Sequence, residues 1–150
     1  MSDYAFNRQA VFDYLILEKF EAGLKLTGQE VKSIRTGQIS LKSAFVVIQG
    51  EEAWLLNASI SPYQPHNTPA GYNPTRSRKL LLHKAEIRSL IGKTKQVGLT
   101  LVPLRVYNLK GKIKLEFALC RGKKQYDKRE QINRRETDRQ IRRALRGKKE

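Results

Sequence analysis

The chain has 150 residues, and 39% of them are hydrophobic, which is enough for one folded domain with an appendage. Its 30 Lys and Arg residues exceed its 14 Asp and Glu residues, and the net charge of +16 favours a polyanionic partner. Nucleic acid ranks before a membrane surface, because the sequence has no basic amphipathic helix with large apolar residues. The single cysteine, Cys120, excludes an internal disulfide and a thiolate zinc site.

The first part of the chain predicts a strand followed by a helix. Residues 12–26 are rich in aromatic and aliphatic side chains and predict the strand, with a bulge or bend at Gly23. The helix covers residues 27–37, because Thr27 and Glu30 have the spacing of a capping box.

The next part alternates hairpins with a loop and a helix. In chain order these are a hairpin over residues 44–60, a long loop over 61–79, a helix over 83–96 and a hairpin over 99–120. Gly50 marks the first turn, and Pro103 predicts an edge position or a bulge in the second hairpin. Short strands with a few small helices favour a mainly β fold, an OB-fold-like antiparallel β-barrel with flanking short α-helices.

Half of the basic excess lies in the last fifth of the chain. Residues 121–150 hold 13 of the 30 Lys and Arg residues and few apolar ones. We therefore predict an RNA-binding body over residues 1–122 and a basic C-terminal tail over 123–150. Because Ile141 and Leu145 form an apolar stripe only one turn wide, we expect the tail to be disordered alone and helical when a polyanion neutralises its arginines.

Basic residues also cluster at two places in the body. The first cluster lies where the long loop meets the second helix and contains Arg76, Arg78, Lys79 and Lys84. The second contains Lys110, Lys112 and Lys114, whose alternation would project all three from one face of a strand. We interpret this face as a phosphate-binding stripe, and the alternative is an edge strand guarded by lysines.

Glu21 runs against the basic character of the chain. One interpretation pairs it with Lys19 or Lys25 at the surface. The other makes it an acceptor for a hydrogen bond from the edge of a base, because phosphates would repel a carboxylate.

No catalytic or metal-binding set emerges from the sequence. His66 and His83 have no partner for nucleophilic or general-base chemistry, the glycines have the spacing of turns, and the acidic residues do not form a metal-binding cluster. No apolar run reaches the roughly 18 residues of a membrane span, and the N-terminus has no signal pattern. We therefore expect a cytoplasmic protein without enzymatic activity, cofactor or metal.

Five stretches carry a resemblance to a known family. They are FEAGLKLTGQEVKSIRTGQ, ISPY, NPTRSRKLLLHKAEI, IGKTKQVGLTLVPLRVY and GKKQYDKRE. In content and order they resemble the small protein B family, the bacterial SsrA-binding proteins, from about Asn7 to the C-terminus. The resemblance implies an OB-like barrel that binds the tRNA-like domain of transfer-messenger RNA and delivers this RNA to stalled ribosomes for trans-translation.

The resemblance also implies further partners and the binding residues. Elongation factor Tu would be reached through the RNA, and the tail would contact the decoding centre and the empty messenger channel of the small ribosomal subunit. The RNA-contacting positions of the family fall on Asn7, Glu21, Leu81 and Lys114, with the basic neighbours Arg78, Lys79, Lys84, Lys123 and Lys124. The positions that face the ribosome fall on Asp127, Lys128 and Arg129 and, in the helical part of the tail, on Ile141 and Leu145.

The chain departs from the family at Phe12, where many relatives have His, so an RNA contact there would be made by stacking. The tail has Ala144 and Leu145 where relatives often have larger apolar pairs. The alternative function is that of a structural ribosomal protein whose basic tail threads through ribosomal RNA.

Overall fold

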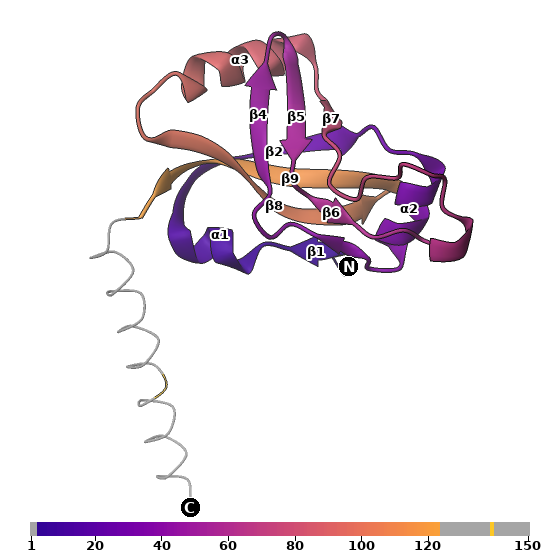
Figure 1. Cartoon of the computed structure of the whole chain (residues 1–150). Coiled ribbons are helices and arrows are strands. Elements are labelled where there is room, and N and C mark those ends of the chain that lie inside the picture. The colour runs from indigo at the N-terminus through magenta and orange to yellow at the C-terminus, as the bar shows by residue number, and fades with distance from the viewer. Residues whose placement is uncertain (1–2, 124–138, 140–150) are drawn as a thin grey trace, which may run out of the picture.

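The computed structural model describes residues 3–123 and residue 139. Within them the chain folds into a β body with short helices on its outside (Figure 1). The predicted tail residues lie outside the described residues; they are Lys124, Asp127, Lys128, Arg129, Ile141, Ala144 and Leu145. No helix of the described part combines the length and the apolar character that crossing a bilayer requires.

The helices of the described part are short: α1 (Arg8–Asp13), α2 (Gly28–Arg35), the 3₁₀ turn η1 (Pro65–Asn67) and α3 (Lys84–Thr94). The strands are β1 (Ala5–Phe6), β2 (Tyr14–Leu24), β3 (Ile39–Ser40), β4 (Phe45–Gln49), β5 (Glu52–Leu56), β6 (Ser59–Ile60), β7 (Arg78–Leu81), β8 (Leu99–Leu109) and β9 (Lys112–Gly122).

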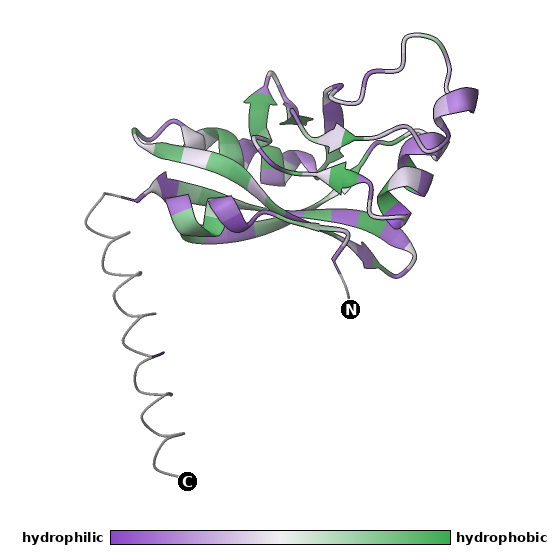
Figure 2. Ribbon diagram, turned by 60° about the horizontal axis from the view of Figure 1, so that its bottom comes forward, coloured by the Kyte–Doolittle hydropathy of each residue, from purple (hydrophilic) through white to green (hydrophobic). Residues whose placement is uncertain are grey.

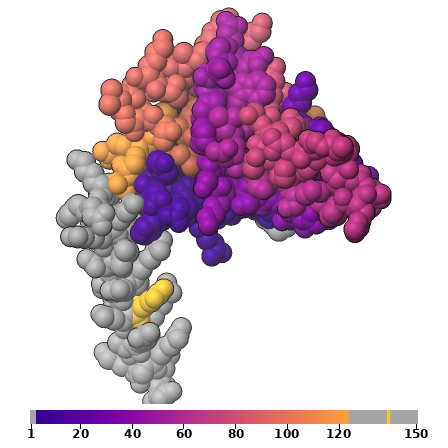
Figure 3. Space-filling model, in the orientation of Figure 1, coloured from indigo at the N-terminus to yellow at the C-terminus, as the bar shows by residue number. Residues whose placement is uncertain are grey.

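The main sheet is antiparallel and curls into a barrel. Its order is β1-β8-β4-β5-β7-β2-β9, and β9 also pairs with β8, so the pairings form a ring to which β1 is added. Two seams of the ring are thin, because β4 meets β8 at the single pair Val46–Leu101 and β2 meets β7 at two pairs. In the space-filling view the β4–β5 hairpin forms a ridge beside α3 (Figure 3). The predicted OB-like antiparallel fold with flanking helices is confirmed, with partly open seams.

The two faces of β9 bury different parts of the chain. Leu115 and Phe117 point into the barrel and join the main core, and the alternation of apolar and polar residues follows the long strands (Figure 2). On the opposite face, Ala118 and Cys120 are buried in a second cluster that includes a residue of α1. Helix α1 therefore covers the outer face near the end of β9, and the part that carries Lys114 is left for other contacts.

The predicted helix and turn signals are confirmed. Thr27 and Glu30 form the capping box of α2, with Thr27 N donating to Glu30 Oε1 at 2.9 Å. The β8–β9 hairpin turns at Lys110 and Gly111, whose φ angles of 51° and 79° match the twist of two-residue hairpins. A bulge lies at Pro103, as its sequence context predicted.

The predicted start of the first strand, at residue 12, is wrong. The strand begins at Tyr14, because Arg8–Asp13 form α1. This helix is too short to show a helical repeat in the sequence. Asn7 caps this helix by accepting a hydrogen bond from the backbone N–H of Ala10 at 3.2 Å. The end of the predicted long loop is also wrong, since β7 begins at Arg78.

The bulge expected at Gly23 lies elsewhere in β2, between Ile16 and Glu18. Gly23 itself is paired on both sides. A Cβ atom at Gly23 would lie 3.3 Å from the Cβ atom of Leu81, so the glycine allows β7 to approach β2 closely.

Candidate nucleic-acid interface

An open groove with a volume of about 690 Å³ lies between β2, β7, β9 and the start of α3, with the turn of the β4–β5 hairpin at its side. Five of the residues expected to contact RNA line this groove: Glu21, Lys79, Leu81, Lys84 and Lys114. They come from distant parts of the sequence, so it is the curled sheet that brings them together.

Glu21 is held by a tyrosine on the outer face of the sheet. Its Oε2 atom accepts a hydrogen bond from the hydroxyl group of Tyr107. Burial raises the pKa of Tyr107, and the hydrogen bond to Glu21 raises it further, so this hydroxyl stays a neutral donor at physiological pH. Within the described residues Glu21 has no ion pair with Lys19 or Lys25. Lys19 pairs with Glu116 instead, with 3.9 Å between Nζ and Oε1.

The row of three lysines predicted from the alternation is only partly present. Lys112 and Lys114 lie on the same face of β9, but Lys110 lies in the turn and does not extend their row. Lys79 pairs with Glu52 at 3.3 Å, and both side chains remain more than a third exposed. Such an ion pair contributes little to stability, so Lys79 is available to exchange Glu52 for a phosphate.

Leu81 places an apolar side chain among these charges. It is 53% exposed, although it lies in a strand. A second hollow of about 350 Å³ shares Gly23, Leu81 and Lys114 with the groove and adds Arg35 and Lys112. Leu81 therefore stands between a groove lined by three lysines and four glutamates and a hollow lined by Arg35, Lys112 and Lys114. An apolar contact of Leu81 with a ribose or a base can accompany contacts with phosphates there.

Arg78 does not belong to the groove. It is 0% exposed, and its Nε atom donates to Glu30 Oε2 at 2.7 Å. Its remaining nitrogens donate to the carbonyl oxygens of Ala58 at 2.6 Å and Pro74 at 2.9 Å. We therefore correct the expectation that Arg78 contacts RNA, because its guanidinium group is used to fix the end of the long loop inside the protein.

Glu30 is the buried partner of this arginine and of Arg76. Burial by itself would raise the pKa of Glu30, but hydrogen bonds from Arg76, the Thr27 backbone and Arg78 outweigh it and hold the pKa below its ordinary value. Sequence reasoning assigned Glu30 to the capping box alone. The arginines are 46 and 48 positions away, so no local pattern could reveal the ion pairs.

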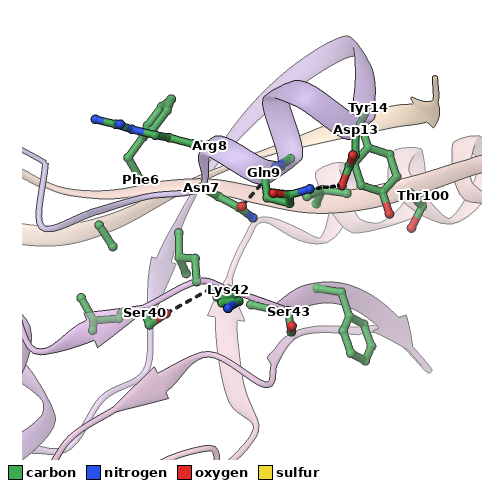
Figure 4. A pocket seen from close by; sticks show the side chains of 17 residues that line it. Phe6, Asn7, Arg8, Gln9, Asp13, Tyr14, Ser40, Lys42, Ser43 and Thr100 are labelled. Atoms are coloured by element: carbon green, nitrogen blue, oxygen red, sulfur yellow. Dashed lines mark hydrogen bonds between the residues drawn. The ribbon is translucent and has the colours of Figure 1, made fainter. Parts of the chain in front are cut away.

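Asn7 lies in a separate hollow of about 820 Å³, formed by β1, α1 and the segment before β4 (Figure 4). Its side chain is used twice, as the cap of α1 and as a donor to the carbonyl oxygen of Pro103 at 3.0 Å. Arg8 lies beside it, and Lys42 lies across the hollow (Figure 4). The start of β4 lines this hollow, whereas the turn after β4 lines the groove, so the expected RNA contacts divide between two places.

Lys123 ends the main described range, beside α1. Its Nζ atom donates to the carbonyl oxygen of Val11 at 3.2 Å, and its backbone N–H donates to that of Asp13 at 2.9 Å. Phe12 of α1 is partly buried in the same region. Asp13, which accepts the backbone hydrogen bond from Lys123, also lines the hollow of Asn7.

The cysteine and the possible metal ligands of the described part were expected to carry no chemistry. Burial raises the pKa of the Cys120 thiol to about 11, which keeps it protonated and unreactive at neutral pH. Across residues 3–123 and residue 139, His, Cys, Asp and Glu side chains form no group of three or more that could hold a metal ion.

The fold and the groove define a class of protein. A partly open antiparallel barrel that presents lysines, a fixed carboxylate and an exposed leucine has the architecture of OB-like proteins, whose strands and loops receive oligonucleotides. The family follows from comparison with known sequences: the family described as SmpB protein matches residues 4–147, and the chain belongs to it. The resemblance seen in the five sequence stretches is thereby confirmed.

Individual relatives agree with this assignment. The SsrA-binding protein of Trichodesmium erythraeum is 55% identical over 139 residues, which cover 93% of this chain and 89% of the relative. The SsrA-binding protein of Sulfurihydrogenibium sp. is 54% identical over 144 residues, covering 96% and 94%. A solved structure described as "tmRNA-SmpB: a journey to the center of the bacterial ribosome" is 48% identical, with a TM-score of 0.66 over 80% of this chain and 84% of that one.

Proposed function

We propose that this chain binds the tRNA-like domain of transfer-messenger RNA and delivers that RNA to stalled ribosomes for trans-translation. The observation that carries the proposal is the groove, where Glu21, Leu81 and Lys114 meet although they are far apart in the sequence. The relatives that are named SsrA-binding proteins and the similar structure of tmRNA–SmpB support it.

The residues of the groove have different tasks in this proposal. Lys79, Lys84 and Lys114 contact phosphates, which supplies affinity for any RNA. Glu21 supplies selectivity, because a carboxylate repels phosphates and accepts hydrogen bonds from the amino or imino groups of an unpaired base. Leu81 packs on a ribose or base that the neighbouring contacts hold in place.

We assign the body, residues 1–122, to RNA binding and the tail, residues 123–150, to the ribosome. In this proposal the decoding centre receives Asp127, Lys128 and Arg129, and the empty messenger channel receives the segment that contains Ile141 and Leu145. The composition of the tail supports the assignment, since cationic side chains suit a channel lined by ribosomal RNA phosphates. A messenger that still fills the channel would exclude the tail, so the tail would detect that the message has ended.

The protein is not an enzyme in this account. It fixes the position of an RNA on the ribosome, and elongation factor Tu is reached through that RNA. The place of action is the cytoplasm, where the ribosome works. Asn7, Lys123 and Lys124 add contacts outside the groove.

A reconstituted translation reaction with a messenger that lacks a stop codon tests the proposal. With transfer-messenger RNA and this chain, the stalled peptide gains a tag. The double variant Glu21→Ala, Lys114→Ala lowers tagging by at least about tenfold, because it removes two charged contacts. Lys95→Ala removes an exposed lysine away from the groove and leaves tagging unchanged.

Absence of tagging with the wild-type chain would reject the proposal. If the chain then stayed at one copy per ribosome through washing in high salt, it would instead be a structural ribosomal protein.

A further inference from the structure

We propose that Tyr107 is a positioning residue for Glu21, and that its hydroxyl group fixes the direction in which the carboxylate of Glu21 faces the RNA. The inference rests on the proposed function of the groove and deepens it. It assigns part of the selectivity of the groove to a nearly buried side chain that does not touch the RNA.

The register of three neighbouring strands produces this contact. Tyr107 of β8 lies opposite Lys114 of β9, and Glu21 of β2 lies opposite Glu116 of β9. The side chain of Tyr107 therefore crosses the middle strand on its outer face to reach Glu21 Oε2. Tyr107 is only 6% exposed, so its hydroxyl group needs a partner inside the protein, and that partner is Glu21.

Arg105 holds the ring of Tyr107 in place. The two residues are two positions apart on β8 and face the same side, and the guanidinium carbon of Arg105 lies 4.0 Å from the centre of the ring. Two ion pairs fix this guanidinium group: its Nη1 atom lies 2.9 Å from Asp3 Oδ1, and its Nη2 atom lies 3.3 Å from Glu116 Oε2. A continuous set of contacts thus extends from Asp3 to the carboxylate of Glu21.

Fixing Glu21 matters because three lysines line the same groove, together with Glu51, Glu52 and Glu86. If Glu21 had no fixed partner, its carboxylate would pair with one of these lysines, and the groove would lose a phosphate contact and its acceptor for a base. The hydroxyl group of Tyr107 occupies Oε2 and leaves Oε1 as an acceptor. Burial and the hydrogen bond keep this hydroxyl group neutral, so it remains a donor to Glu21.

The variant Tyr107→Phe tests the inference, because it removes one hydroxyl group and keeps the ring under Arg105. Binding of the tRNA-like domain at physiological salt should weaken by about tenfold. Two readouts should stay unchanged: the dependence of this binding on salt, because no cation is lost, and the affinity for a plain RNA duplex. The matched control is Tyr72→Phe in the long loop. It removes a hydroxyl group that donates to the carbonyl oxygen of Ile60 at 2.7 Å. This control should bind the tRNA-like domain like the wild-type chain.

The same change in a Glu21→Ala background separates positioning from direct contact. The inference predicts no further loss of binding there, because Tyr107 acts only through Glu21. An equal loss in both backgrounds, or no loss in the wild-type background, would overturn it. If Glu21→Ala alone leaves binding unchanged, the proposed role of Glu21 in the groove fails first, and the positioning role fails with it. Urea unfolding of each variant establishes that the proteins compared are folded.

Discussion

Glu30 combines two tasks in one side chain. It closes the capping box of α2 with Thr27, and it neutralises Arg76 and Arg78 at the end of the long loop. Breaking a buried ion pair is costly, because the remaining partner is left without a counter-charge in an apolar environment. Glu30 therefore links the loop before β7 to α2, beside the hydrogen bond that Ser33 of α2 donates to the carbonyl oxygen of Ser61 at 2.7 Å.

The variant Glu30→Gln keeps the size of this side chain and removes its charge. We expect urea denaturation at pH 7 to show a loss of roughly 3 kcal/mol in the free energy of unfolding. The pKa of Glu30 is lowered in the folded chain, so its stabilisation is complete above the unfolded value of 4.5 and is lost as the pH falls through the native pKa. The wild-type chain should therefore lose stability more steeply below pH 4.5 than the variant does. Glu51→Gln, at the exposed hairpin turn, serves as the control, and an equal loss in both variants would contradict the ion-pair account.

Lys114 provides a test of the phosphate contacts. Replacing it by alanine removes one cation from the open face of β9, and we expect the slope of log K against log salt to become shallower by roughly one counterion for the tRNA-like domain. Filter binding or fluorescence anisotropy over a series of salt concentrations measures this slope. Lys95→Ala is matched in charge, and an identical slope for wild type and Lys114→Ala would exclude Lys114 from phosphate contact.

At the scale of elements, the predictions succeeded where the signal was local. The capping box of α2, the turn at Gly50 and the bulge near Pro103 each depend on a few adjacent residues, and the structure has all three. Helix α1 was missed because it has six residues, which is less than two turns. The bulge of β2 was misplaced because it compensates the register with β9, a strand almost a hundred residues later.

The candidate site shows the same division. Charge and alternation were enough to name Lys79, Lys84 and Lys114, and these residues do share one groove. Arg78 was placed among them because an arginine in a polar segment is usually exposed. Its burial is decided by Glu30, and the support of Glu21 is decided by Tyr107, both across long sequence separations. Such contacts become visible only in the folded sheet.

The proposed separation of RNA binding in the body from ribosome binding in the tail predicts the effect of shortening the chain. A chain that ends after Gln125 keeps the groove and the hollow of Asn7, which are the proposed contacts for the tRNA-like domain. Its affinity for this domain should therefore stay within about threefold of the wild-type value. Addition of the tag to stalled peptides should be abolished, because the segment proposed for the ribosome is removed. Binding and tagging assays on the same preparation measure both effects. A collapse of RNA binding in the shortened chain would show that the body and the tail do not act separately.

For the whole molecule, affinity and selectivity have different sources. The cations of the body attract any RNA, whereas the cations of the tail are those proposed to contact ribosomal RNA. The groove adds a carboxylate whose direction is set by its neighbours, and an exposed leucine beside it. A family member that identifies one RNA among many needs this second part, because charge alone cannot distinguish one set of phosphates from another.

The most direct measurement is a competition binding assay at physiological salt. A labelled tRNA-like domain of transfer-messenger RNA competes with ordinary tRNA and with a plain RNA duplex for the wild-type chain and for Glu21→Ala. We predict that the wild-type chain strongly prefers the tRNA-like domain and that Glu21→Ala loses much of this preference while it still binds the duplex. Equal binding of all three RNAs, unchanged by the substitution, would contradict recognition by the groove and leave the net charge as the sole source of binding.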